Sequence, residues 1–254
     1  MKRLVFFFIL FFSLMPCSNR AYSQKSGQVE YQLYTHKGVN VIHKGVLKYN
    51  DSLSIFISDA VLNGFIEFLF IDSLNEKNNK KLMFFGARKN PYKQIIDLNN
   101  QMILSEQKFL DSTYVTVEPT SLFDWKLSHE TKNILGYACS SATSSFRGRQ
   151  YKVWYTEAVP VSFGPWKTHG LSGLILEVQI DGGLFKMVAT SIDTTQFYRI
   201  EEKELIRNIR ILPIQEYLIK REFYFNSFIE MMKRKIPDNY SIVINLDDNL
   251  ELFQ

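Results

Sequence analysis

The stretch GLILEVQIDGGLFKMVATSI, residues 173–192, decides the fold class. Two apolar runs flank the turn sequence Asp181-Gly182-Gly183. Glycine tolerates the positive backbone angles of tight turns, so this pattern is a strong signal for a β-hairpin. Three successive aliphatic residues at 174–176 further indicate a strand that is covered on both faces.

Short strand patterns continue in both directions from this hairpin. Alternating or continuous apolar runs are separated by turn residues, for example at 50–52 and 99–100. The chain does not alternate strands with helices as a parallel sheet requires, so the sheet is expected to be antiparallel. The predicted strands outside the hairpin cover residues 29–33, 45–49, 53–57, 65–71, 81–85, 92–98, 102–104, 114–118, 138–146 and 151–156.

In the last quarter of the chain the spacing of apolar residues changes from a strand pattern to a helix pattern. Apolar side chains recur at spacings of three, four and seven between Ile214 and Met232, which predicts an amphipathic helix over about residues 213–235. Pro213 suits the start of a helix, and Pro237 stops one. A short acidic tail follows, and a solvated tail explains its carboxylates better than a cation site.

These patterns predict a mainly β or α+β fold. We expect a curved antiparallel sheet, with a half-open barrel as a variant, and one C-terminal helix packed on it. The composition fits a folded chain, since 46% of the 254 residues are hydrophobic and 22% are charged. With no Pro/Ser-rich linker, residues 24–254 are expected to form a single domain.

The N-terminus is typical of a secretory signal peptide. Lys2 and Arg3 precede an apolar run at 4–15 that is too short to span a bilayer, and small residues favour cleavage after Ser23. Removing residues 1–23 leaves 27 basic against 26 acidic residues, so no nucleic-acid partner is expected. No later apolar run could span a membrane. The predicted location is therefore periplasmic or secreted.

Two cysteines bear on this location. Cys17 lies inside the signal, and lipidation at Cys17 is the alternative to cleavage after Ser23, although Pro16 stands where a small residue is expected. Cys139 then has no partner for a disulfide, and we expect it to be a buried thiol of a strand.

A series of short motifs resembles a known family. In order they are WKL at 125–127, ETK at 130–132, ILGY at 134–137 with Cys139, FRGR at 146–149, YKVWYT at 151–156, GPWK at 164–167 and GLSGLILE at 170–177. Together they resemble the GLPGLI family of Gram-negative envelope proteins, with Ser172 where that family has proline. The resemblance implies a secreted or periplasmic protein of unknown function.

The motif region also contains the candidate binding surface. Arg147 and Arg149 flank a turn and could grip an acidic partner, or they could be exposed charges of a hairpin. Glycines bracket a tight corner, which is typical of a folding motif but also of a contact site for a ligand or partner. The candidate residues are Arg147, Arg149, Trp154, Tyr155, Gly164, Pro165, Trp166, Gly170, Leu171, Gly173, Leu174 and Ile175.

A search for catalytic patterns gives little. His169 and Ser172 could in principle form a base and nucleophile, but no glycine-rich phosphate loop, metal-ligand spacing or cofactor motif accompanies them. We therefore predict a non-catalytic envelope binding or structural module, whose partner is an envelope protein or an apolar ligand. A lipid or lipoprotein carrier with an apolar cavity and an uncharacterised hydrolase are the alternatives.

Overall fold

The computed structural model describes residues 25–37, 39–59, 65–85, 91–109, 112–196, 198–201 and 210–245. The predicted signal peptide, Cys17 and the acidic tail lie outside these residues. The first strands are β1 (Gly27–Lys37), β2 (Val39–Tyr49), β3 (Leu53–Ser58), β4 (Phe65–Asp72), β5 (Lys80–Phe85), β6 (Tyr92–Asp97), β7 (Met102–Phe109) and β8 (Ser112–Pro119). The remaining elements are β9 (Lys126–Ile134), β10 (Tyr137–Phe146), β11 (Arg149–Thr156), β12 (Leu174–Ile180), β13 (Phe185–Asp193), β14 (Arg210–Pro213), α2 (Ile214–Lys233) and β15 (Tyr240–Asn245), with short 3-10 turns at Glu76–Asn78 and Asp181–Gly183.

Most strands form one large sheet. Its order is β14-β8-β7-β6-β3-β2-β1-β13-β12-β11-β10-β9. Neighbouring strands are antiparallel, as predicted, and Asp181–Gly183 connects β12 to β13 as the sequence indicated. One pair differs from the prediction, because β14 pairs with β8 in parallel, from Arg210↔Tyr114 to Pro213↔Val117.

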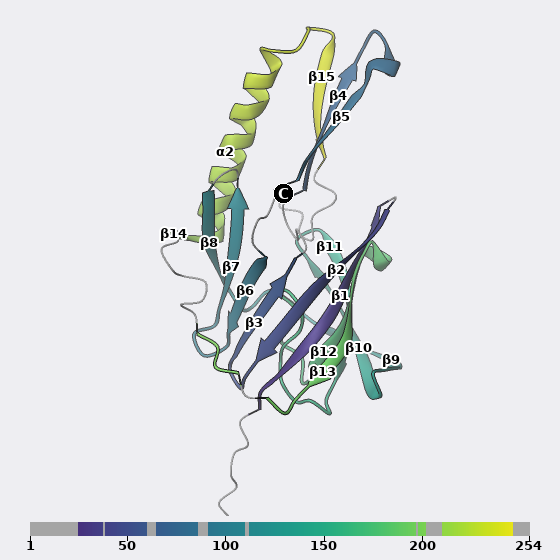
Figure 1. Cartoon of the computed structure of the whole chain (residues 1–254), viewed down its shortest axis with the longest axis vertical. Helices are drawn as coiled ribbons and strands as arrows, with labels where there is room; N and C mark the ends of the chain where they lie inside the picture. Colours follow the sequence, from purple (N-terminus) through teal and green to yellow (C-terminus); the bar gives the residue numbers. More distant parts are fainter. Residues whose placement is uncertain are drawn as a thin grey trace, which may run out of the picture.

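The sheet is strongly curved (Figure 1). Bulges interrupt the pairing beside Tyr31 in β1, Ser141 in β10 and Trp154 in β11. A bulge bends a strand and increases its twist, which lets a sheet of this size wrap around a core. Among the described strands β14 and β9 form the two ends of the order and do not pair with each other, so the sheet stays open.

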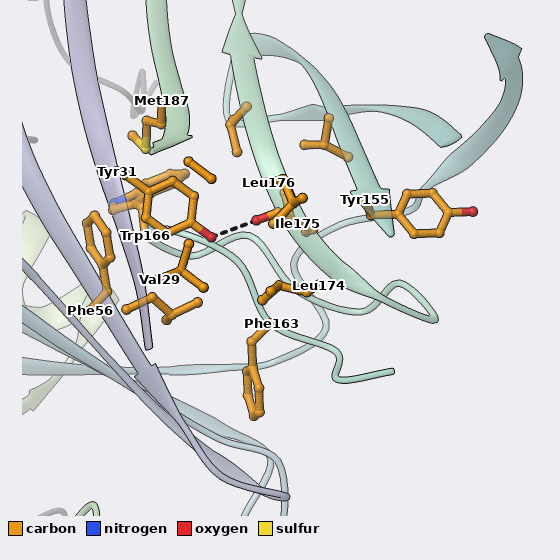
Figure 2. Close-up of a cluster of buried hydrophobic side chains, with 14 of the residues drawn as sticks. Val29, Tyr31, Phe56, Tyr155, Phe163, Trp166, Leu174, Ile175, Leu176 and Met187 are labelled. Carbon is orange, nitrogen blue, oxygen red and sulfur yellow. Dashed lines mark hydrogen bonds between the residues drawn. The ribbon is translucent and has the colours of Figure 1, made fainter. Parts of the chain in front are cut away.

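The main core lies against this curved sheet. Tyr31 of β1 donates a hydrogen bond through its hydroxyl to the carbonyl of Ile175 at 2.7 Å, and its ring packs edge-on against Phe56 (Figure 2). Leu174, Ile175 and Leu176 are all fully buried, which confirms the prediction of a strand covered on both faces. A smaller apolar cluster, centred on Ile55, Ile95, Leu104 and Val115, packs with Ile200.

Helix α2 confirms the helix prediction in type and position. Its first turn is anchored by buried Ile214 and Tyr217, and the Tyr217 ring lies 6.0 Å from that of Tyr114 in β8. After the helix the chain forms β15, a strand that the sequence analysis missed, in a second sheet of order β15-β4-β5. In the described part of the chain, none of the helices has the length and apolarity needed to cross a bilayer.

Candidate functional site

The motif region folds into a corner between β11 and β12. We use the name motif corner for the connecting segment 157–173 together with Glu118, Arg147 and residues 120–125, which contact it. The segment turns inward, and its Phe163 and Trp166 side chains are fully buried. The amide of Ile175 donates to the carbonyl of Phe163 at 2.9 Å, so the corner is tied to the start of β12.

Two glycines make this tight path possible. A Cβ on Gly164 would lie 2.7 Å from both Ile175 Cβ and Thr168 Oγ1. A Cβ on Gly173 would lie 2.1 Å from the carbonyl oxygen of Thr156, closer than real atoms approach. Glycine is therefore required by close packing at these two positions, as expected of a folding motif.

A buried ionic cluster lies beneath the corner. The Glu118 side chain, at 0% exposure, accepts hydrogen bonds from Lys167 Nζ and, at 2.5 Å, from Arg147 Nη2. Burial alone would raise the pKa of the Glu118 carboxyl, but the charges and hydrogen bonds of Lys167 and Arg147 hold that pKa below its usual range. Glu118 is thus an ionised carboxylate that fixes two cations, one from the β10–β11 turn and one from the corner.

His169 joins the corner to the segment that follows β8. Its Nδ1 lies 2.7 Å from the carbonyl oxygen of Lys167, and its Nε2 lies 2.7 Å from that of Thr120. Burial lowers the pKa of His169, and the two hydrogen bonds to carbonyls oppose that shift without cancelling it. The carbonyl of His169 in turn accepts from Trp125 Nε1 at 2.7 Å.

Aromatic rings connect this segment to the core. Phe123 stacks on Trp125, with ring centroids 4.8 Å apart and planes 11° apart, and its other neighbours include Tyr151 at 5.2 Å. Tyr151 stacks on Trp166 at 5.9 Å. Trp125 is the partly exposed end of this series, whereas Tyr151 and Trp166 are buried. The indole of Trp125 is therefore held rigidly at the surface by Phe123 and His169.

Exposed polar residues stand close in the sequence to Trp125 and to Gly170, which approaches it. Asp124 is exposed next to it in the sequence. Gly170, with a backbone φ of +96°, presents no side chain there, and a Cβ would lie 3.7 Å from Trp125 Nε1. Two residues farther on, exposed Ser172 donates to Glu157 Oε1 at 2.6 Å. We call Trp125, Asp124, Glu157, Gly170 and Ser172 the corner surface.

The predicted site residues do not all converge on this surface. Arg147 binds buried Glu118, and Arg149, itself 5% exposed, pairs with Asp181 at 2.5 Å, so neither is a freely exposed hairpin charge. Tyr155 is buried in the same core cluster as Trp166 (Figure 2), and Trp154, also buried there, is covered by Lys132 Nζ at 3.4 Å from its ring centroid. Most of the others are buried, namely Gly164, Pro165, Trp166, Leu171, Gly173, Leu174 and Ile175.

Ser172 and His169, the candidate nucleophile and base, each hydrogen-bond to other partners. Ser172 is hydrogen-bonded to Glu157, while both ring nitrogens of His169 face backbone carbonyls. The described residues contain no group of three or more His, Cys, Asp or Glu side chains that could hold a metal ion. Cys139 is buried at 2% exposure, as predicted.

Sequence reasoning missed Glu118, Lys167 and the Phe123–Trp125 pair. Glu118 belongs to a strand whose alternation places its side chain on the same face as buried Thr116. A carboxylate on a core face needs a cation, and that requirement was the available signal.

Comparisons with known proteins identify a matching family and two similar folds. Residues 66–214, which is 149 of 254 residues, match the family model described as N-glycanase peptide, N-terminal domain. The fold is similar to that of two solved structures of PNGF-II, with TM-scores of 0.53 and 0.51 and 19% identity in both. These matches cover 76% and 74% of this chain but 32% and 31% of those chains, so the chain spans about a third of the length of the solved structures. A search of curated proteins finds no significant match.

The family match corrects two predictions. The resemblance to the GLPGLI family is wrong, because the matched model covers the motif corner and describes an N-glycanase domain. The prediction of a non-catalytic module is wrong for the same reason. The sequence motif of the corner is explained by steric requirements of the fold, such as those at Gly164 and Gly173. It therefore does not indicate an activity. The chain belongs to the family of the N-glycanase peptide N-terminal domain.

Proposed function

We propose that this protein has an N-glycanase-type function and acts on sugar chains that are linked to asparagine side chains. The observation that carries this proposal is the family match over residues 66–214, which includes the entire motif corner. The similarity to PNGF-II supports the fold assignment on which the proposal builds.

The reaction is the hydrolysis of the amide between an asparagine side chain and the first sugar. Water adds its oxygen to the amide carbonyl, the carbon–nitrogen bond breaks, and a proton passes to the departing glycosylamine. The peptide product carries aspartate in place of asparagine. Carboxylates assist such steps by taking the proton from water and returning it to the leaving nitrogen.

The corner surface is the region that we assign to the substrate. Trp125 offers a rigid, partly exposed indole, and the apolar face of a sugar ring packs well on such a platform. Asp124 precedes it in the sequence, and Glu157 and Ser172 belong to the same motif corner, which Trp125 contacts through the carbonyl of His169. The two carboxylates are the candidates for proton transfer. Buried Glu118 has a different task, because Lys167 and Arg147 occupy its carboxylate.

We also propose that the chain is exported through the predicted signal at residues 1–23, with residues 24–254 as the mature domain. Asparagine-linked glycans are found mainly on exported and cell-surface proteins, so a secreted or periplasmic location would bring the domain to such substrates. The absence of a membrane-spanning helix in the described part of the chain is compatible with this location.

The test is glycan release by the purified mature chain. An asparagine-linked glycopeptide is incubated with the protein, and free glycan and deglycosylated peptide are quantified by mass spectrometry. We expect release by the wild-type chain and a rate at least about tenfold lower for Trp125→Ala, since a buried aromatic contact contributes more than about 1.4 kcal/mol.

The matched control is Leu127→Ala, which removes an apolar side chain that is 71% exposed on β9. It should release glycan at the wild-type rate. No release by the folded wild-type chain would overturn the proposed function. Release that is equally fast in Trp125→Ala would retain the function but remove the corner surface from it.

A further inference from the structure

Helix α2 carries large apolar side chains on an exposed face. Ile219 is 68% exposed, Phe223 is 67% exposed and Met231 is 44% exposed. These positions are separated by four and eight residues, so they follow one stripe along the helix. Ser227 completes the stripe between Phe223 and Met231 and is also exposed.

The opposite face of α2 is the one that contacts the rest of the chain. Ile214 and Tyr217 are buried there, and Leu218 packs against their cluster. The helix therefore carries apolar side chains on two sides, of which only one is covered (Figure 1 shows α2 at the margin of the large sheet). A solvated helix face normally carries polar residues, so an apolar stripe of this length indicates a contact surface.

Charged residues flank the stripe in an order that is complementary to itself. Glu216 and Lys220 stand near its start, and Glu230 and Arg234 stand near its end. The four residues fall at helical spacing on the same face as Ile219 and Phe223. Within the chain, Lys220 lies 3.7 Å from Glu216, and Glu230 lies 2.9 Å from Lys233, in contacts that are partly exposed to solvent.

We propose that this stripe is the interface with a second copy of the chain, and that two α2 helices pack antiparallel around a two-fold axis at the level of Phe225. In this register Glu216 faces Arg234 of the second copy, and Lys220 faces Glu230 of the second copy. Because the axis is two-fold, each of these opposite-charge pairs forms twice.

The apolar positions fit the same register. Ile219 faces Met231 of the second copy, and Phe223 faces the small Ser227 of the second copy, so a large side chain meets a gap on both sides of the axis. The helix segment from Glu216 to Arg234 is about 27 Å long, which suits antiparallel packing of two helices at a shallow angle. Three large apolar side chains per copy make a small interface, so the dimer should be weak.

This surface is separate from the proposed function. The family match ends at residue 214, where α2 begins, and the corner surface lies on other elements. Failure of the dimer would therefore leave the N-glycanase proposal unchanged, and the reverse also holds.

The test is the mass of the intact mature chain, measured by analytical ultracentrifugation from micromolar to millimolar concentration. We expect a reversible monomer–dimer equilibrium that weakens in high salt, because exposed charge pairs are screened. Phe223→Glu should abolish the dimer. Leu74→Glu, at an 82% exposed residue beside the second sheet, introduces the same charge elsewhere and should leave the dimer intact.

Charge reversal distinguishes this register from nonspecific association through the exposed apolar residues of the helix. Lys220→Glu and Glu230→Lys should each weaken dimerisation at least about fivefold, because each places like charges opposite each other. The double variant should recover most of the wild-type affinity. A chain that stays monomeric throughout, a dimer that survives Phe223→Glu, or a double variant no better than the single ones would overturn the proposal.

Discussion

Replacing Gly173 with alanine tests the steric account of the motif corner. The new Cβ would lie 2.1 Å from the carbonyl oxygen and 2.5 Å from the carbonyl carbon of Thr156, and 2.8 Å from the amide nitrogen of Glu157. All three atoms belong to the backbone, so no side-chain rotation can relieve the clash. The end of β11 or the start of β12 must move, and Ile175 must then shift from its packed position.

Overpacking a well-filled region costs about 1–3 kcal/mol, and a clash with fixed backbone belongs at the upper end of that range. We therefore expect Gly173→Ala to lower the free energy of unfolding by about 3 kcal/mol. For a domain of this size this corresponds to a fall of roughly 6–12 °C in melting temperature. Urea unfolding followed by tryptophan fluorescence measures the change.

The matched control is Gly136→Ala. Gly136 has a backbone φ of +86°, but a Cβ there would meet no atom within 4 Å. Its cost is limited to backbone strain of about 1 kcal/mol. A Gly173→Ala variant that is as stable as the wild type, or no less stable than Gly136→Ala, would refute the close-packing argument.

Three further predictions concern the interior. Glu118→Gln leaves the buried ammonium of Lys167 without its carboxylate and should cost about 3–5 kcal/mol in urea unfolding; a loss below about 1 kcal/mol would contradict the ionic cluster. Acid should destabilise the fold in two steps, because the folded-state pKa values of His169 and Glu118 lie below their usual 6.5 and 4.5. As the pH falls through the range of each group, the unfolded chain binds the proton more readily than the folded chain, and stability is lost. Urea midpoints that stay constant from pH 7 to pH 4 would contradict this. Cys139, which is buried and whose pKa is raised by burial, should react with iodoacetamide only when the chain unfolds, and rapid labelling of the native protein would show that its burial is wrong.

The fold was largely predictable because its strongest signals are local. The Asp181-Gly182-Gly183 turn and the spacing of apolar residues after Pro213 each depend on a few neighbouring residues, and both predictions are confirmed. Strand β14 was not predictable in the same way. It pairs in parallel with β8, about a hundred residues earlier in the chain, and such a pairing leaves no local pattern.

The candidate site was less predictable because it depends on contacts between distant residues. Arg147 has the sequence context of an exposed turn charge, but its partner Glu118 lies on another strand and is not visible in the local pattern. The family resemblance failed for a related reason. Glycine, proline and tryptophan at the motif corner satisfy sterics and packing, and such requirements do not specify a reaction.

The proposed N-glycanase function is tested most directly by running the release reaction in water enriched in heavy oxygen. The mass of the peptide product is then determined. Hydrolysis of the amide predicts aspartate with one heavy oxygen in its side chain, and this yield should fall in Trp125→Ala. A product that keeps asparagine, with or without a remaining sugar, or a peptide that stays fully glycosylated, would contradict the account.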